Sequence, residues 1–145
     1  MSGDKKHTLV VLVVNGDYGR ELAETAEVLV GDLDVQVVET TCQLGVDEVR
    51  VRVRARLLAL TEGAASVLLL TDLCGSTPCN VCLTLLKENS GWELLTGLNL
   101  PMLLKLATCD RSMRARALAL QLQATAASSI KLGTPLLAEE TTRGD

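Results

Sequence analysis

Aromatic residues are almost missing from this chain of 145 residues, which has one Trp, one Tyr and no Phe. Proteins that bind single-stranded nucleic acid stack bases on aromatic side chains, and few are available here. Lys and Arg number 14 against 18 Asp and Glu, so the net charge is −4, and no basic tail occurs. Neither the stacking surface nor the basic surface of a nucleic-acid-binding protein is therefore expected.

Long apolar runs are also missing. A helix that crosses a bilayer needs about 20 apolar residues, and no segment approaches that length. The run Thr8–Val14 follows basic residues, but it is too short for a signal peptide and ends in a polar turn. The five cysteines are an odd number, which argues against a disulfide framework. We expect a cytoplasmic protein.

The apolar content of 48% predicts a packed core, built mainly from aliphatic residues. The length suits one domain, residues 1–145, with a core at about 8–133 and a polar, mobile tail at 139–145. Four segments are typical of strands: Thr8–Val14, Asp34–Glu39, Ala65–Leu70 and Trp92–Thr96. Segments with helical periods follow them: Tyr18–Val30, Asp47–Leu60, Pro78–Lys87, a helix opened by Pro101, and Asp110–Ala126. Ile130–Leu132 is a candidate for a short final strand.

The segment Asp47–Leu60 has two interpretations. Its alternation of Val and Arg is typical of a strand, but Val49, Val53 and Leu57 also share one side of a helix. We favour the helix, because Asp47 would then lie at its positive N-terminal end. Strands that alternate with helices predict an α/β fold, with a parallel sheet and helices on both faces.

Three polar turns follow the first, third and fourth predicted strands: Asn15–Asp17, Asp72–Pro78 and Gly97–Pro101. In a parallel sheet these turns meet at the carboxyl edge, where ligands bind. In the second turn, Asp72 is followed by Gly75, Ser76 and Thr77 at the start of a helix. Backbone N–H groups and hydroxyls there could hold an anion, and the alternative is a plain helix start capped by Ser76 or Thr77.

Two of these turns carry family motifs. The segment DLCGSTPCN at Asp72–Asn80 resembles the Asp-x-x-Gly-Gly-Ser-Pro-x-Asn segment of enzyme IIA domains from the mannose class of the sugar phosphotransferase system. The segment TGLNLPML at Thr96–Leu103 is similar to that family's Gly-x-Asn-Leu/Ile-Pro-Met-Leu segment. Asn15-Gly16 lies where the family has His-Gly before a helix. The resemblance runs from about Val10 to Ser128.

The resemblance implies a three-layer fold with a four-stranded parallel sheet of order 2-1-3-4, a short antiparallel C-terminal strand, and a homodimer. It also implies a relay, in which the family's histidine, at the position that Asn15 holds here, takes phosphate from the phosphocarrier HPr and passes it to an enzyme IIB. Asp72 would orient that histidine, and Gly16, Gly75, Ser76 and Thr77 would hold the phosphate. Asn99 and Pro101 would belong to the partner surface. No metal or cofactor is implied, and contact with the membrane would be indirect, through a transporter complex.

This sequence has Asn15 where the family has its phospho-accepting histidine. An amide has no basic lone pair, so it can hydrogen-bond Asp72 but cannot form a transferable phosphoramidate. Ser76 and Thr77 also depart from the family's Gly-Ser. The only histidine, His7, precedes the first strand and is expected at the opposite end of the sheet, about 25 Å away.

Cysteine offers two further interpretations. Cys74, beside a helix N-terminus, could carry phosphate or act in redox chemistry, although Asp72 opposes a lowered thiol pKa. Cys74, Cys79 and Cys82 have the spacing of an iron–sulfur motif, but the last two fit a buried helix face better. The leading hypothesis is a regulatory enzyme IIA relative that cannot relay phosphate. The alternatives are a genuine phosphocarrier with an engineered His-to-Asn change, and a small-anion sensor that uses Gly75–Thr77.

Overall fold

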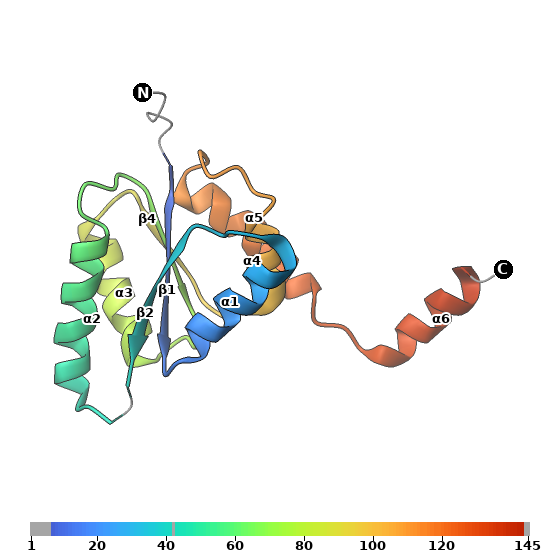
Figure 1. Ribbon diagram of the computed structural model, residues 1–145, viewed down its shortest axis with the longest axis horizontal. Coiled ribbons are helices and arrows are strands. Elements are labelled where there is room, and N and C mark those ends of the chain that lie inside the picture. The colour runs from blue at the N-terminus through green and yellow to red at the C-terminus, as the bar shows by residue number, and fades with distance from the viewer. Residues whose placement is uncertain (1–6, 42, 144–145) are drawn as a thin grey trace.

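The computed structural model describes residues 7–41 and 43–143 (Figure 1). Within them, four parallel strands form one sheet of order β2-β1-β3-β4, which confirms the predicted α/β fold and strand order. The strands are β1 (Leu9–Asn15), β2 (Val35–Thr40), β3 (Val67–Thr71) and β4 (Trp92–Leu95). Both central strands are aliphatic throughout their middle residues, as burial on two faces requires.

Helices cover both faces of the sheet. Their bounds are α1 (Tyr18–Val30), α2 (Val46–Leu60), α3 (Thr77–Glu88), α4 (Leu100–Leu106), α5 (Ala115–Ser128) and α6 (Gly133–Arg143). In Figure 1, α2 and α3 lie on one side of the strands, and α1, α4 and α5 lie on the other. The fold therefore has the three layers expected of alternating strands and helices.

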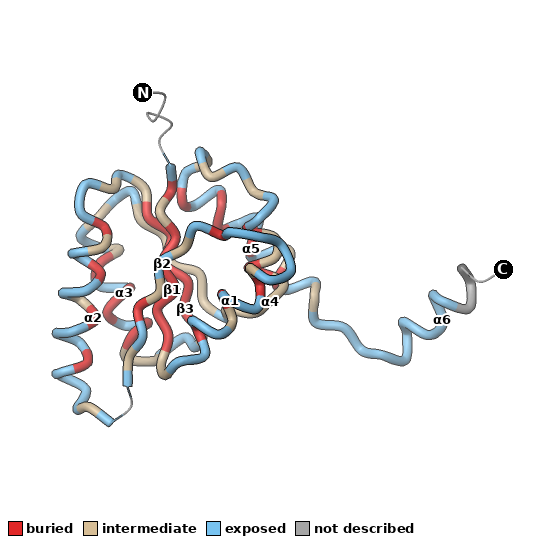
Figure 2. The backbone as a smooth tube through the Cα atoms, in the orientation of Figure 1, coloured by how far each residue is buried: buried red, intermediate tan, exposed pale blue. Residues whose placement is uncertain are grey.

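The core has two halves, one on each face of the sheet. Val10 and Leu12 of β1 pack with α1, α4 and α5, whereas Val11 and Val13 pack with α2 and α3. This division follows from the two-residue period of a strand, which sends successive side chains to opposite faces. Figure 2 shows the resulting band of buried backbone through the centre of the molecule.

The ambiguous Val-Arg segment is helical, as we favoured. Val49, Val53 and Leu57 are buried at four-residue spacing on α2. A strand would have sent all its valines to one face and its arginines to the other. The helix instead buries Val49 and Val53 and leaves Val51 exposed. It also turns Arg50 and Arg52 toward solvent.

The prediction of a short antiparallel strand at Ile130–Leu132 is wrong. In the described chain this segment has no regular structure, Ile130 and Leu132 are 82% and 80% exposed, and no strand lies beside them. A three-residue strand needs a sheet edge to pair with, and the chain here leads away from the body into α6 (Figure 1). Residues 139–143 of the expected mobile tail belong to α6, and 144–145 lie outside the described residues.

The predicted helix at Asp110–Ala126 begins five residues late. Residues 110–114 form a turn, in which the Asp110 carboxylate accepts hydrogen bonds from the Ser112 N–H at 2.9 Å and its hydroxyl at 2.7 Å. Arg111 donates from this turn to the backbone carbonyls of Thr8, Leu33 and Asp34. The turn therefore fastens the amino ends of β1 and β2. None of the helices within the described ranges is long and apolar enough to cross a membrane.

Candidate functional site

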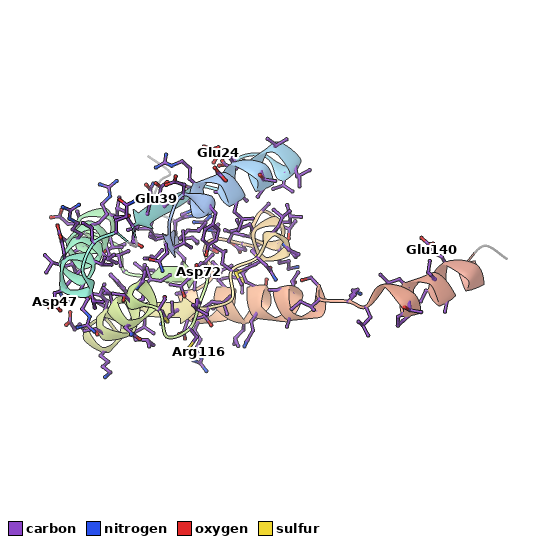
Figure 3. All side chains as sticks on the ribbon, turned by 90° about the horizontal axis from the view of Figure 1, so that it is seen from below. Glu24, Glu39, Asp47, Asp72, Arg116 and Glu140 are labelled. Carbon is purple, nitrogen blue, oxygen red and sulfur yellow. The ribbon has the colours of Figure 1, made fainter. Side chains whose placement is uncertain are left out.

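The order of the strands reverses between β1 and β3. The chain runs from β1 outward to β2 on one side, and from β3 to β4 on the other. Val13 of β1 pairs with Thr71 of β3, so Asn15 and Asp72 follow the paired residues at the same carboxyl edge. Figure 3 looks onto this edge, and Asp72 lies near its centre. This is the position where open α/β sheets bind ligands.

Asn15 ends β1 and is held by β2. Its side-chain Oδ1 accepts a hydrogen bond from the Thr40 hydroxyl at 2.5 Å. The next residue, Gly16, donates its backbone N–H to the Thr40 carbonyl at 2.6 Å and has a φ of 74°, a conformation that favours glycine. The expected hydrogen bond between Asn15 and Asp72 is not among the contacts of these two residues in the described structure.

The second turn is built from contacts of its own residues. The Asp72 carboxylate accepts a hydrogen bond from the Leu73 N–H at 2.9 Å. Gly75 has a φ of 92°, which turns the chain toward α3. The Ser76 hydroxyl caps that helix by accepting the Cys79 N–H at 3.2 Å. The simpler interpretation of Ser76, as a helix cap, is therefore confirmed for its hydroxyl.

Thr71 contains a polar atom without a partner. The residue is fully buried, and among the described side chains its Oγ1 alone is buried without a hydrogen bond. An unpaired buried hydroxyl costs about 1–3 kcal/mol. Thr71 is not one of the site residues predicted from the sequence, although a threonine at the end of an aliphatic strand is a polar residue where burial is expected. This hydroxyl lies directly before the Asp72 turn and faces the same side of the sheet as Val13.

The third turn also has a structural role. The Asn99 side chain caps α4, because its Oδ1 accepts the Met102 N–H at 3.0 Å. Its amide nitrogen donates to the Ala126 carbonyl of α5 at 3.4 Å, which ties the two helices together. Pro101 lies in the first turn of α4 and is half-buried. Both residues therefore position the carboxyl edge.

Of the other candidate groups, His7 lies away from this edge and two cysteines lie inside the core, whereas Cys74 lies in the Asp72 turn. His7 stands at the amino end of β1, where its Nε2 is 3.0 Å from the Asp34 carboxylate. Cys74 is exposed, whereas Cys79 and Cys82 are buried on α3, and burial raises the pKa of Cys82 to about 12. Within residues 7–41 and 43–143, no cluster of three or more His, Cys, Asp or Glu could hold a metal ion.

Three-layer α/β domains with polar turns at the switch point occur in many families that bind phosphate groups, so the fold alone does not identify the family. The chain belongs to the family of mannose-class phosphotransferase IIA domains, because the family model described as the PTS system fructose IIA component matches residues 9–123. Among curated proteins, none matches the chain at a significant level.

Solved structures share this fold. The mannose/sorbose-specific IIA subunit from Enterococcus faecalis is 26% identical, with a TM-score of 0.76 over 87% of this chain and 94% of that one. An EIIA component from Streptococcus agalactiae is 24% identical, with a TM-score of 0.75 over 86% and 96% of the two chains. A IIA protein associated with the fucose utilization operon of Streptococcus pneumoniae is 22% identical, with a TM-score of 0.75 over 90% and 96%.

Proposed function

We propose that this chain is an enzyme IIA-like protein that binds partners of the phosphotransferase system without relaying phosphate. The proposal rests on Asn15, which occupies the end of β1 at the switch point, where the family resemblance places the phospho-accepting histidine. The Asn15 carbonyl oxygen is already engaged by the Thr40 hydroxyl. A carboxamide in this position has no basic nitrogen, so the nucleophile of the relay is gone.

Neither alternative nucleophile replaces the missing imidazole. His7 lies at the amino end of the strand that Asn15 ends, and β1 spans seven residues, or about 23 Å. Cys74 is exposed and lies in the turn after β3, not at the end of β1, where the family resemblance places the nucleophile.

The remaining features support a binding role. We assign Gly16, Gly75, Ser76 and Thr77 to a retained phosphate cradle, with Asp72 beside it. Asn99 and Pro101 complete the surface for an HPr-like phosphocarrier, an enzyme IIB or a regulatory protein in the cytoplasm. A homodimer would cover exposed apolar side chains of α6, such as Leu137, which is 64% exposed. A chain that stays unphosphorylated would give such partners a constant signal.

A phosphorylation assay tests the proposal. The full chain is incubated with phosphoenolpyruvate, enzyme I and HPr, and phosphate on each protein is followed by intact-protein mass spectrometry. We expect HPr to become phosphorylated and this chain to remain unmodified. Phosphate on the wild-type chain would overturn the proposal. The same samples, analysed by size exclusion, report whether the chain still binds HPr.

The substitution Asn15→His shows whether the rest of the site is competent. If the cradle is intact, the variant becomes phosphorylated and the modification is labile in acid, as phosphohistidine is. The matched control combines Asn15→His with Asp72→Asn, which removes the orienting carboxylate and should slow the transfer. The single variant Asn15→His also tests the alternative of an engineered His-to-Asn change. A phosphocarrier whose histidine had been replaced by asparagine would regain full activity when the histidine is restored.

A small-anion sensor is the second candidate function, and the buried hydroxyl of Thr71 favours it. The Ser76 N–H already donates to the Leu73 carbonyl at 3.3 Å. An anion held by the N–H groups of Gly75 and Thr77 would lie at the N-terminus of α3, close to the turn that follows Thr71. Titration with inorganic phosphate, followed by amide NMR shifts, tests this function. Saturable shifts confined to residues 71–79 support it, and no shift at these residues rejects it.

A further inference from the structure

We propose that a second site lies between the carboxyl end of β2 and α2, and that it binds a small carboxylate with a short aliphatic body. A cavity of ≈ 270 Å³ opens there, on the opposite side of Thr40 from α1. Its wall combines buried valines with two arginines from α2. This site is separate from the proposed phosphate cradle and does not depend on the proposed function.

Arg52 and Arg56 supply the positive charge of the cavity. They are four residues apart on α2, so their side chains share one face of the helix. Arg52 has one exposed partner, the Glu48 carboxylate at 2.8 Å. Arg56 has no ion pair among the described residues, and the helix positions three and four residues away from it are Arg, Val, Ala and Leu. Two like charges at this spacing repel, which an anion between them would relieve.

The acid of the cavity wall is already neutralised. Glu39, at the end of β2, pairs with Arg20 of α1 at 2.6 Å. This hydrogen bond and its charge raise the pKa of Arg20. Glu39 is therefore turned toward α1, beside which it lies in Figure 3, and it leaves the charge of Arg56 available to a ligand. Guanidinium groups bind carboxylates in a planar, two-bond geometry, which suits this pair of arginines.

The apolar residues that line the cavity determine which uncharged part of a ligand it can accept. Val38, Val49 and Val53 line it and are 3%, 6% and 2% exposed. Sugar hydroxyls placed against these methyl groups would lose hydrogen bonds to water without replacement. An aliphatic group would instead gain from leaving water. The combination of a cationic mouth and an aliphatic floor therefore selects a short branched or straight-chain carboxylate over a sugar phosphate.

Thr40 gives the site a reporter. It lines the cavity, and its hydroxyl donates to the Asn15 side chain at 2.5 Å. A ligand that contacts Thr40 is therefore expected to shift the NMR signals of the Asn15 side-chain amide. The titration uses the full chain alone, so its result is independent of HPr, enzyme I or any phosphorylation.

Four probes separate charge from body in this titration. Isovalerate has both the carboxylate and the branched aliphatic group, isovaleramide lacks the charge, acetate lacks the body, and glucose 6-phosphate has a polar body. We expect isovalerate to bind saturably in the millimolar range, with shifts at Val38, Thr40, Val53 and Asn15, and more tightly than the other three. Equal binding of isovaleramide or glucose 6-phosphate, or no saturable shift with isovalerate, would overturn the proposal.

Two matched variants locate the site. Arg56→Gln removes the unpaired cation and should weaken isovalerate binding by about fivefold or more, since an exposed charge-assisted contact contributes about 1 kcal/mol. Arg50→Gln removes an arginine of the same helix that lies on the α3 side, paired with Asp47 at 3.8 Å, and should leave binding unchanged. Equal weakening in both variants would show a nonspecific charge effect and reject the site.

Discussion

The substitution Gly19→Ala tests how closely α1 packs on the strand that carries Asn15. Gly19 is buried in the first turn of α1. A Cβ added there would lie 2.2 Å from Cγ2 of Val14, and within 3.6 Å of the two other carbons of that side chain. Val14 precedes Asn15 and is fully buried, so it has no free space to enter. The absence of a side chain at position 19 lets the helix approach the end of β1.

The expected cost follows from this distance. Two carbon atoms that are not bonded are normally at least about 3.5 Å apart. The added Cβ and Val14 Cγ2, at 2.2 Å, must therefore move apart by about 1.3 Å. Overpacking of this kind costs about 1–3 kcal/mol, and the contact is at the severe end. Alanine gains about 1 kcal/mol over glycine inside a helix. We expect a net loss of about 2 kcal/mol, which lowers the melting temperature by about 4–8 °C.

Urea unfolding followed by circular dichroism measures this loss, and a double-mutant cycle identifies its cause. Val14→Ala alone should cost about 2 kcal/mol, because it removes two buried methyl groups. In that background Gly19→Ala should cost nothing or become stabilising. Thr25→Ala, on the exposed side of α1, controls for helix propensity and should stabilise slightly. An equal cost of Gly19→Ala in both backgrounds, or no cost in the wild type, would refute the packing argument.

Three further outcomes concern α3 and the cysteines in it and in the turn before it. Ser76→Ala should lower the free energy of unfolding by about 1 kcal/mol, because the Cys79 N–H loses its cap, and Thr77→Ala should cost less in the same urea assay. The pKa of Cys82 is about 12 in the folded chain against 9.0 ordinarily, so only the unfolded chain releases this proton and stability falls as pH rises from about 9 to 12. Cys82→Ala should remove up to about 1.4 kcal/mol per pH unit of that fall, and an unchanged slope would contradict the assignment. Iodoacetamide should modify Cys74 before Cys79 or Cys82, as mapped by mass spectrometry.

The sheet and most helices could be predicted because their signals are local. Continuous aliphatic runs marked β1 and β3, and the four-residue spacing of Val49, Val53 and Leu57 outweighed the Val-Arg alternation. The carboxyl edge followed from parallel strands alone, since every such strand ends on the same side. The motifs then predicted which turns form the candidate site, and the family model matches the same part of the chain.

Contacts between distant segments could not be predicted in the same way. The local pattern at Ile130–Leu132 is typical of a strand, but a strand forms only where the segment can pair with a sheet edge. After α5 the chain leads away from the sheet, so this segment pairs with no strand. The Asn15 side chain could hydrogen-bond either neighbour of β1, and only the register with β2 shows Thr40 as its partner. Asp72 likewise bonds the Leu73 N–H within its own turn.

Some motif residues stabilise the fold, and others are free to act on a phosphoryl group. Ser76 and Asn99 cap helices, and Gly75 adopts a positive φ, so these residues are needed for the fold even in a chain that transfers no phosphate. Their resemblance to the family therefore says little about activity. Thr77 is different, because its hydroxyl makes no hydrogen bond in the described structure and α3 is capped without it. If Thr77→Ala leaves stability unchanged but abolishes phosphorylation in the Asn15→His background, the hydroxyl serves the phosphoryl group alone.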